Sequence, residues 1–247
     1  NAADFTFTNN TVSNNGSYGI TGYGVTNAAI TDNTIQDNGY AGIYLDGSTG
    51  VLIQRNTVQN HSQYGIYLSS STATISDNNQ ILNNGQYGIY ATASTLSITG
   101  NTISDHTTAA IYLDHDTRLG STVSGNTLSG NALDDVLIGG TISADVTWSG
   151  TYLVASITVA ADVTLTIQPG TVVKFAQGGS ISISGTLSAV GTAALPIYFT
   201  SLKDDTVGGD TNGDGAATIP ERGNWGYLQF AAGSSDSVLD NVVVRYG

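Results

Sequence analysis

Short runs in which hydrophobic and polar residues alternate recur along the first half of the chain in a fixed order. One run follows an Asn, a second holds a Gly-Ile-Tyr phrase, and a third is a plain alternation such as Val51-Leu52-Ile53. The first run recurs at Asn10, Asn33, Asn56, Asn79, Asn101 and Asn126, with sequence spacings of 23, 23, 23, 22 and 25. Alternation with period two predicts strands, so each period holds three short strands.

Three strands in a period of about 23 residues leave few residues for each corner. Such corners are too short for a crossover helix or for a four-stranded propeller blade. The chain must therefore coil, and equivalent strands of successive coils stack into three parallel sheets around a narrow core, rising about 4.8 Å per coil. Strand alternation predicts that Ile43 and Leu45 point inward and that Tyr44 points outward. The predicted fold class is all-β.

A second set of polar residues keeps step with the first, five positions later. It consists of Asn15, Asn38, His61, Asn84, His106 and Asn131. We interpret both sets as corner residues, because Asn tolerates the left-handed backbone conformation and its amide can bond to the same amide one coil away. His61 and His106 stand at Asn places, so we interpret them as corner residues rather than as ligands or catalysts.

The repeated Asn-Thr-Ile/Val, Asn-Asn-Gly and Tyr-Gly-Ile-Tyr phrases resemble the right-handed parallel β-helix repeats of secreted bacterial proteins. The resemblance covers residues 4–138 and implies a right-handed parallel β-helix, or β-solenoid. It indicates the fold more than the function, because such repeats occur in polysaccharide lyases, glycoside hydrolases, epimerases, adhesins and passive stalks.

Composition changes near residue 139, which predicts two blocks, 1–138 and 139–247. Of the 20 Asn residues, 17 lie at or before Asn131, whereas all three Pro residues lie after it. The spacing from Leu165 to Leu187 is 22 and that from Lys174 to Tyr198 is 24, so we expect coils of the same length to continue. The phrase from Leu165 to Phe175 resembles the opening segment of secreted bacterial β-helix domains. An insertion over 201–224 interrupts this second block.

The charge balance excludes several classes of partner. The chain has 6 Lys and Arg against 19 Asp and Glu, a formal net charge of −13, so it cannot form the basic stripe that nucleic acid requires. Two further absences in the sequence narrow the possibilities. The chain has no Cys, which excludes disulfides and thiolate metal sites. No apolar run reaches the roughly 20 residues of a membrane span.

The insertion carries the one strong chemical motif, a calcium loop. Asp210, Asn212, Asp214, Gly215 and Glu221 match positions 1, 3, 5, 6 and 12 of the pattern D-x-[DN]-x-[DN]-G-x5-E. Alternate side chains on a tight arc converge on one point, Ala216 would offer its carbonyl, and Glu221 would close the far side. The flanking Gly residues exclude the helices of an EF-hand, and the loop resembles those of dockerins and bacterial surface proteins. Asp204 and Asp205 would add an outer ligand or raise the local negative field, and the alternative is a solvated acidic turn without metal.

A catalytic site is the weaker interpretation. Asp114 and Asp116, with Arg118 and with Asp134 and Asp135 one coil later, could bring paired carboxylates together as in glycoside hydrolases. The chain lacks the Lys and Arg residues that hold anionic sugars in β-helix enzymes, and Asp114 lies in the coil whose repeat spacing lengthens to 25. We therefore interpret Asp114, Asp116 and Asp135 as residues of a solvated turn and expect no enzyme activity.

An outward column of tyrosines is a second candidate for a binding surface. Tyr44, Tyr67, Tyr90 and Tyr112 follow one another at sequence spacings of 23, 23 and 22. Exposed aromatic rings can bind sugars or a neighbouring filament, or can stabilise the parallel ladder without a partner, and we favour the ladder.

These observations predict an extracellular structural β-solenoid, one repeating unit of a bacterial surface stalk or filament stiffened by Ca²⁺. The alternative is a carbohydrate-active or carbohydrate-binding β-helix that recognises surface polysaccharide. The chain begins Asn1-Ala2 without Met and enters a coil already running, so we expect a processed product or a fragment. Unpaired strand edges at both ends would join copies head to tail.

Overall fold

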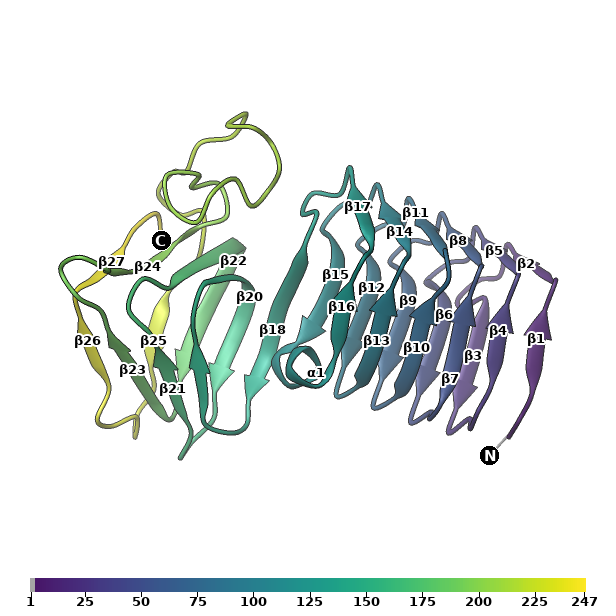
Figure 1. The fold of residues 1–247 in the computed structure, drawn as a ribbon, viewed down its shortest axis with the longest axis horizontal. Helices are drawn as coiled ribbons and strands as arrows, with labels where there is room; N and C mark the ends of the chain where they lie inside the picture. Colours follow the sequence, from purple (N-terminus) through teal and green to yellow (C-terminus); the bar gives the residue numbers. More distant parts are fainter. Residues whose placement is uncertain (1–2) are drawn as a thin grey trace. The chain divides into compact units, whose positions relative to one another are not determined.

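The computed structural model describes residues 3–247, so Asn1 and Ala2 of the predicted first block lie outside the described residues. The chain forms two compact units, Asn1–Val136 and Leu137–Gly247, which we call unit 1 and unit 2 (Figure 1). Both units are built from parallel strands, and the one helix of residues 3–247 is α1 (His115–Gly120). No helix in this range is long and apolar enough to cross a membrane.

Unit 1 contains three parallel sheets, as predicted, and successive coils contribute one strand to each. The first sheet holds β1 (Thr6–Thr8), β4 (Ala29–Thr31), β7 (Val51–Gln54), β10 (Thr72–Ser76), β13 (Thr95–Thr99) and β16 (Thr122–Ser124). The second holds β2 (Thr11–Ser13), β5 (Thr34–Gln36), β8 (Thr57–Gln59), β11 (Gln80–Leu82), β14 (Thr102–Ser104) and β17 (Thr127–Ser129). The third holds β3 (Ile20–Tyr23), β6 (Ala41–Asp46), β9 (Tyr64–Ser69), β12 (Tyr87–Thr92) and β15 (Ala109–Asp114).

The core of unit 1 is a stack of aliphatic side chains, one set per coil. Ile43 pairs with Ile66, and Ile66 pairs with Ile89, so the strand register follows the period of the sequence repeat. Ile43 and Leu45 are buried whereas Tyr44 is half-buried on the outer face, as predicted from strand alternation. Burying such stacked aliphatic side chains supplies the main free energy of folding.

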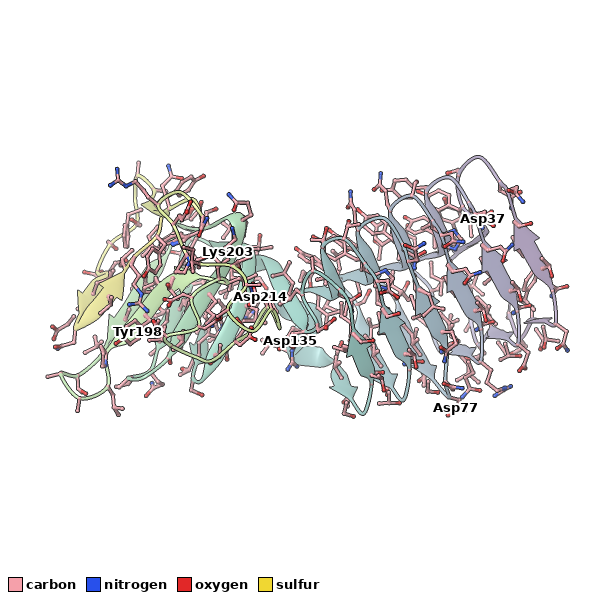
Figure 2. The ribbon with its side chains drawn as sticks, turned by 90° about the horizontal axis from the view of Figure 1, so that it is seen from above. Asp37, Asp77, Asp135, Tyr198, Lys203 and Asp214 are labelled. Atoms are coloured by element: carbon pink, nitrogen blue, oxygen red, sulfur yellow. The ribbon has the colours of Figure 1, made fainter. Side chains whose placement is uncertain are left out.

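Most corners of unit 1 are built from a left-handed residue followed by a buried polar residue. Asp32 has φ 59° before Asn33, Asp37 has φ 55° before Asn38, and both Asp37 and Asp77 lie on the outside of the coils (Figure 2). The expectation that the repeated Asn itself is left-handed is therefore wrong. The preceding residue makes the turn, so the Asn side chain is free to point inward.

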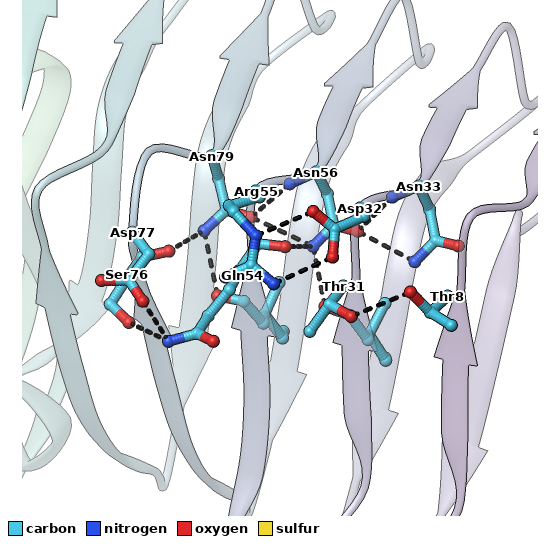
Figure 3. Close-up of polar contacts among 12 residues, drawn as sticks. Thr8, Thr31, Asp32, Asn33, Gln54, Arg55, Asn56, Ser76, Asp77 and Asn79 are labelled. Atoms are coloured by element: carbon cyan, nitrogen blue, oxygen red, sulfur yellow. Dashed lines mark hydrogen bonds and ion pairs between the residues drawn. The ribbon is translucent and has the colours of Figure 1, made fainter.

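The inward Asn side chains form a continuous hydrogen-bonded column (Figure 3). The Asn33 N–H donates to Asn56 Oδ1 at 3.0 Å, and the Asn56 N–H donates to Asn79 Oδ1 at 2.9 Å. Asn56 Nδ2 also donates to the Ile30 carbonyl at 2.8 Å. The side-chain oxygens of the column satisfy backbone N–H groups at the corner, which would otherwise be buried without partners.

Two further columns use the same arrangement at the other corners. In the second, Asn38, Asn84 and Asn131 alternate with His61 and His106, and the Asn38 N–H donates to His61 Nδ1 at 3.1 Å. The third column was not anticipated. It consists of Ser48, Ser71, Ser94 and Thr117, whose hydroxyl oxygens accept backbone N–H groups of the preceding coil.

The Gly of each Tyr-Gly-Ile phrase gives room to the second column. A Cβ atom at Gly65 would lie 2.9 Å from Asn84 Nδ2 and 2.6 Å from the Gly88 carbonyl oxygen. A Cβ atom at Gly42 would lie 2.5 Å from His61 Nε2. These distances are too short for real contacts, so both glycines are required by the close approach of the column rather than by their backbone dihedrals.

Unit 2 contains two parallel sheets. One holds β18 (Val136–Ile142), β20 (Thr151–Val159), β22 (Val172–Ile183), β24 (Ile197–Ser201), β25 (Leu228–Phe230) and β27 (Val242–Val244). The other holds β19 (Val146–Trp148), β21 (Thr164–Ile167), β23 (Thr186–Val190) and β26 (Val238–Asp240). The long strand β22 pairs with β24 along its first part and with β25 along its last part. In the next coil, two separate strands therefore lie beside this single strand.

Register in unit 2 agrees with the sequence spacing at one place and differs at another. Leu165 pairs with Leu187, as their spacing predicts. The spacing of 24 between Lys174 and Tyr198 does not correspond to a strand pairing, because Lys174 pairs with Thr200 instead. The segment between β24 and β25 runs from Leu202 to Tyr227, slightly beyond the predicted insertion of 201–224.

His61 and His106 are buried column residues held in the neutral form. Nδ1 of each ring accepts a backbone N–H, from Asn38 at 3.1 Å and from Asn84 at 3.0 Å, and this bond requires an unprotonated nitrogen. Each Nε2 is buried and lacks a hydrogen bond of regular geometry. Burial lowers the pKa of both rings from 6.5 to about 4, against the weaker opposing effects of nearby carbonyl groups and of Asp37 and Asp105.

This arrangement predicts that acid destabilises unit 1 before its carboxylates titrate. The unfolded chain binds protons at both histidines below pH 6.5 and the folded chain does so only near pH 4, so stability is complete above 6.5 and is lost as pH falls to 4. The loss is on the order of 3 kcal/mol per histidine. Denaturant unfolding between pH 7 and 4 should show this fall in the free energy of unfolding.

The double variant His61→Asn, His106→Asn is the matched control, because Asn fills the same column in the other coils. We expect it to fold and to lose most of the pH dependence between 6.5 and 4. Identical pH profiles for the variant and the wild type would contradict this account of the two rings.

Candidate functional site

The insertion Leu202–Tyr227 is anchored to unit 2 by two buried charged side chains. Lys174, fully buried on β22, donates from Nζ to the Gly209 carbonyl. Asp204, also fully buried, accepts from Arg245 Nε at 2.8 Å and from the hydroxyl of Thr200. These bonds join the insertion to β22 and to the residue that follows β27.

Hydrogen bonds decide the charge state of Asp204. Burial raises the pKa of its carboxyl, but donors from Thr200, Thr206 and Arg245 outweigh burial and hold the pKa below its ordinary value. Asp204 is therefore a charged anchor for Arg245 and is already fully engaged. It does not belong to the group of carboxylates that lies close together at the tip of the insertion.

The tip of the insertion, in which Asp214 is labelled in Figure 2, folds around two carboxylates of the calcium motif. Asp210 accepts the N–H groups of Gly213 at 2.7 Å and of Gly215 at 2.8 Å. Asp214 accepts the N–H groups of Ala217 at 2.9 Å and of Thr218 at 3.0 Å. Left-handed backbone at Gly213, Gly215 and Ala216 allows this tight arc.

A cluster of oxygen atoms lies inside this arc. One carboxylate oxygen from each of Asp205, Asp210 and Asp214 lies within 4.8 Å of the others. Asp205 Oδ1 and Asn212 Oδ1 are buried and have no hydrogen-bond partner. Burial, followed by the charges of Asp210 and Asp214, raises the pKa of the Asp205 carboxyl. Repelling carboxylates and unpaired oxygens are features that a bound cation would relieve.

The structure brings together part of the predicted ligand set. Asp210 and Asp214 belong to the carboxylate cluster, and Asp205 joins them from the start of the insertion. Asn212 contacts the cluster through its amide group, since Nδ2 donates to Asp214 Oδ2 at 2.7 Å. Glu221 is not part of the carboxylate cluster, and its backbone N–H donates to Asn224 Oδ1 at 2.7 Å. The donor set is purely oxygen and carries three carboxylates, which suits the preference of Ca²⁺.

Lys174 places a buried positive charge beside this cluster. Burial lowers the pKa of its ammonium group, while Asp205, Asp204 and Asp210 act in the opposite direction. The ammonium group offsets part of the negative charge of the cluster without occupying it, since its hydrogen bond goes to the Gly209 carbonyl. A cation bound by the arc would feel this charge and bind less tightly.

The carboxylates considered for catalysis take part in local turns. Asp114 caps α1, accepting the N–H of Thr117 at 2.7 Å through Oδ1 and that of Ala93 at 2.7 Å through Oδ2. Asp135 Oδ1 accepts the N–H of Val136 at 2.6 Å, and Asp116 lies 3.2 Å from His115 Nδ1. Asp134 in turn accepts the N–H of Asn131 at 2.9 Å. Each contact suits a helix cap or a corner.

The tyrosine column is larger than the sequence suggested. A second row beside it brings nine rings into continuous contact on the outer face of the third sheet of unit 1. We call these nine residues the tyrosine ladder, and they are Tyr18, Tyr23, Tyr40, Tyr44, Tyr64, Tyr67, Tyr87, Tyr90 and Tyr112. The second row could have been found from the sequence, because Tyr18, Tyr64 and Tyr87 begin the repeated Tyr-Gly-Ile phrases.

Comparison with known proteins agrees with this architecture. The model of the right-handed β-helix region family matches residues 1–153, which is more than half of the chain. No curated protein and no solved structure matches the chain. The match spans the coils whose strands, corner columns and aliphatic core are described above. The chain belongs to the right-handed β-helix family.

Proposed function

We propose that this chain is a structural segment of a bacterial cell-surface stalk or filament, secreted and built from β-helix coils that continue head to tail. The observation that carries the proposal is the uniform coil of unit 1. The same three-strand arrangement and the same buried columns recur from coil to coil, so each coil offers the next a similar template.

Such a coil suits a mechanical role. Each corner column hydrogen-bonds one coil to its neighbour, and the parallel strand ladders do the same. A load along the solenoid axis is therefore shared by many parallel bonds at every level. Charged residues make up only 10% of the chain, so repulsion between coils is small.

We further propose that Ca²⁺ stiffens the insertion of unit 2. The arc around Asp210 and Asp214, with Asp205 and Asn212 at its inner side, supports this role. The Lys174 and Arg245 anchors hold the base of the insertion through contacts of their own. Calcium would therefore order the tip, residues 210–221, rather than dock the whole insertion.

The alternative, a carbohydrate-active or carbohydrate-binding β-helix, has less support. Asp114 and Asp135 are engaged with backbone N–H groups. Some rings of the tyrosine ladder stack on one another, as Tyr90 does on Tyr112 with centroids 4.5 Å apart, so part of the ring surface that a sugar would need is covered by a neighbouring ring.

Calorimetry of the full chain tests the calcium proposal. We expect one Ca²⁺ to bind with Kd on the order of 10⁻⁴ M, as in extracellular modules, and Asp214→Asn to abolish the heat of binding. Asp240→Asn, an exposed carboxylate outside the insertion, should bind as the wild type does. Weaker Ca²⁺ binding by Glu221→Gln than by the wild type would mean that Glu221 moves in to close the bound loop. Equal heats for wild type and Asp214→Asn would rule out this site.

Cryo-electron microscopy of the native material tests the filament proposal. We expect fibres whose strands lie across the fibre axis and give an axial layer line at about 4.8 Å. Native material consisting of isolated, capped molecules without axial repeat would contradict the proposal, whatever the calcium result.

A further inference from the structure

The tyrosine ladder joins the coils of unit 1 through ring contacts. Tyr18 stacks on Tyr44 with ring centroids 5.0 Å apart, and Tyr44 lies 4.8 Å from Tyr67. Farther along, Tyr64 stacks on Tyr90 at 4.9 Å, and Tyr90 stacks on Tyr112 at 4.5 Å with an interplanar angle of 6°. Each of these pairs joins neighbouring coils, so the contacts form one path along the sheet.

The rings of the ladder can be reached from solvent. Eight of them are half-buried, and Tyr23 is 62% exposed. Tyr23 meets Tyr44 edge-on with centroids 5.8 Å apart. An oxidant that acts on Tyr23 is therefore one ring contact away from the stacked pairs.

Unit 1 has no side chain that would be oxidised in place of these tyrosines. The chain contains no Cys and no Met, the residues that most oxidants attack first. Its two tryptophans, Trp148 and Trp225, are buried in unit 2. A one-electron oxidant that meets unit 1 therefore removes an electron from a tyrosine.

We propose that the tyrosine ladder is a site of oxidative modification, in which a one-electron oxidant couples stacked rings of neighbouring coils into dityrosine. The oxidant takes one electron and one proton from each of two phenols. A bond then forms between ring carbons next to the carbons that bear the hydroxyl groups, and the hydrogens on those ring carbons move to the oxygens and restore both phenols. With hydrogen peroxide as oxidant and a haem peroxidase as catalyst, the electrons and protons reduce peroxide to water.

The geometry favours coupling within one chain. The unpaired electron of a tyrosyl radical is spread over the ring carbons, and stacked faces bring these carbons of two rings toward each other. Tyr90 is central to the ladder because it contacts Tyr64, Tyr67, Tyr87 and Tyr112. A link from Tyr90 to Tyr112 would join β12 to β15 covalently and restrict the unfolded chain, as a disulfide does.

The experiment treats the full chain, at low concentration, with a haem peroxidase and hydrogen peroxide. We expect dityrosine fluorescence, a monomer that has lost two hydrogen atoms per link, and cross-linked peptides that join tyrosines of neighbouring coils. The same reaction in denaturant should lose this pairing pattern. Only intermolecular dimers, only hydroxylated monomers, or the same peptides from folded and unfolded chains would overturn the proposal.

Two variants separate the ladder from tyrosine oxidation in general. Tyr90→Phe keeps a ring in the stack but cannot form a phenoxyl radical, so the cross-linked peptides that contain residue 90 should disappear and total fluorescence should fall. Tyr152→Phe changes a tyrosine of unit 2 that stacks on Trp148, and this variant should form as much dityrosine as the wild type does. Equal fluorescence from Tyr90→Phe and wild type would contradict a role for the ladder.

Discussion

The hydrogen-bonded corner columns are the constraint on which the rest of unit 1 depends. A coil with three corners repeatedly interrupts its sheets, and each interruption buries backbone groups that water cannot reach. One left-handed residue makes the turn, and the next residue turns a side-chain acceptor inward to bind the N–H of the neighbouring coil. Asn serves this role at two corners and Ser at the third, so the columns fix both the shape of the coil and its period.

Other features of the sequence follow from the columns. The buried column needs space, which explains the Gly of the Tyr-Gly-Ile phrase, since a Cβ atom at Gly65 would meet Asn84. A column residue can be replaced only by another acceptor of similar size, which explains His61 and His106 and their low pKa. The outward positions are free of this constraint, and there the tyrosines form their own ladder.

The period, the three sheets and the inward Ile and Leu residues could be predicted because they depend on alternation and spacing alone. The serine column could not be found in the same way, because Ser48, Ser71 and Ser94 stand among many other Ser and Thr residues. At the calcium motif, the sequence identified the arc around Asp210 and Asp214, but the cluster also contains Asp205. Asp205 lies outside the motif, and the sequence left it as either an outer ligand or a source of negative field, because the path of the chain from β24 determines its place. For Asp114, the sequence allowed either a catalytic carboxylate or a residue of a solvated turn. Its contacts with the N–H groups of Thr117 and Ala93 show that it caps a helix.

The most direct test of the central claim compares one column Asn with one surface Asn in the same coil. Asn56→Ala leaves the Asn33 N–H buried without a partner and removes the side-chain bond to the Ile30 carbonyl, whereas Asn60→Gly removes only exposed bonds to Asp37 and Asn83 and keeps a left-handed corner. Denaturant unfolding should show a loss of about 3 kcal/mol or more for Asn56→Ala and less than about 1 kcal/mol for Asn60→Gly. Equal losses for the two variants would contradict the account.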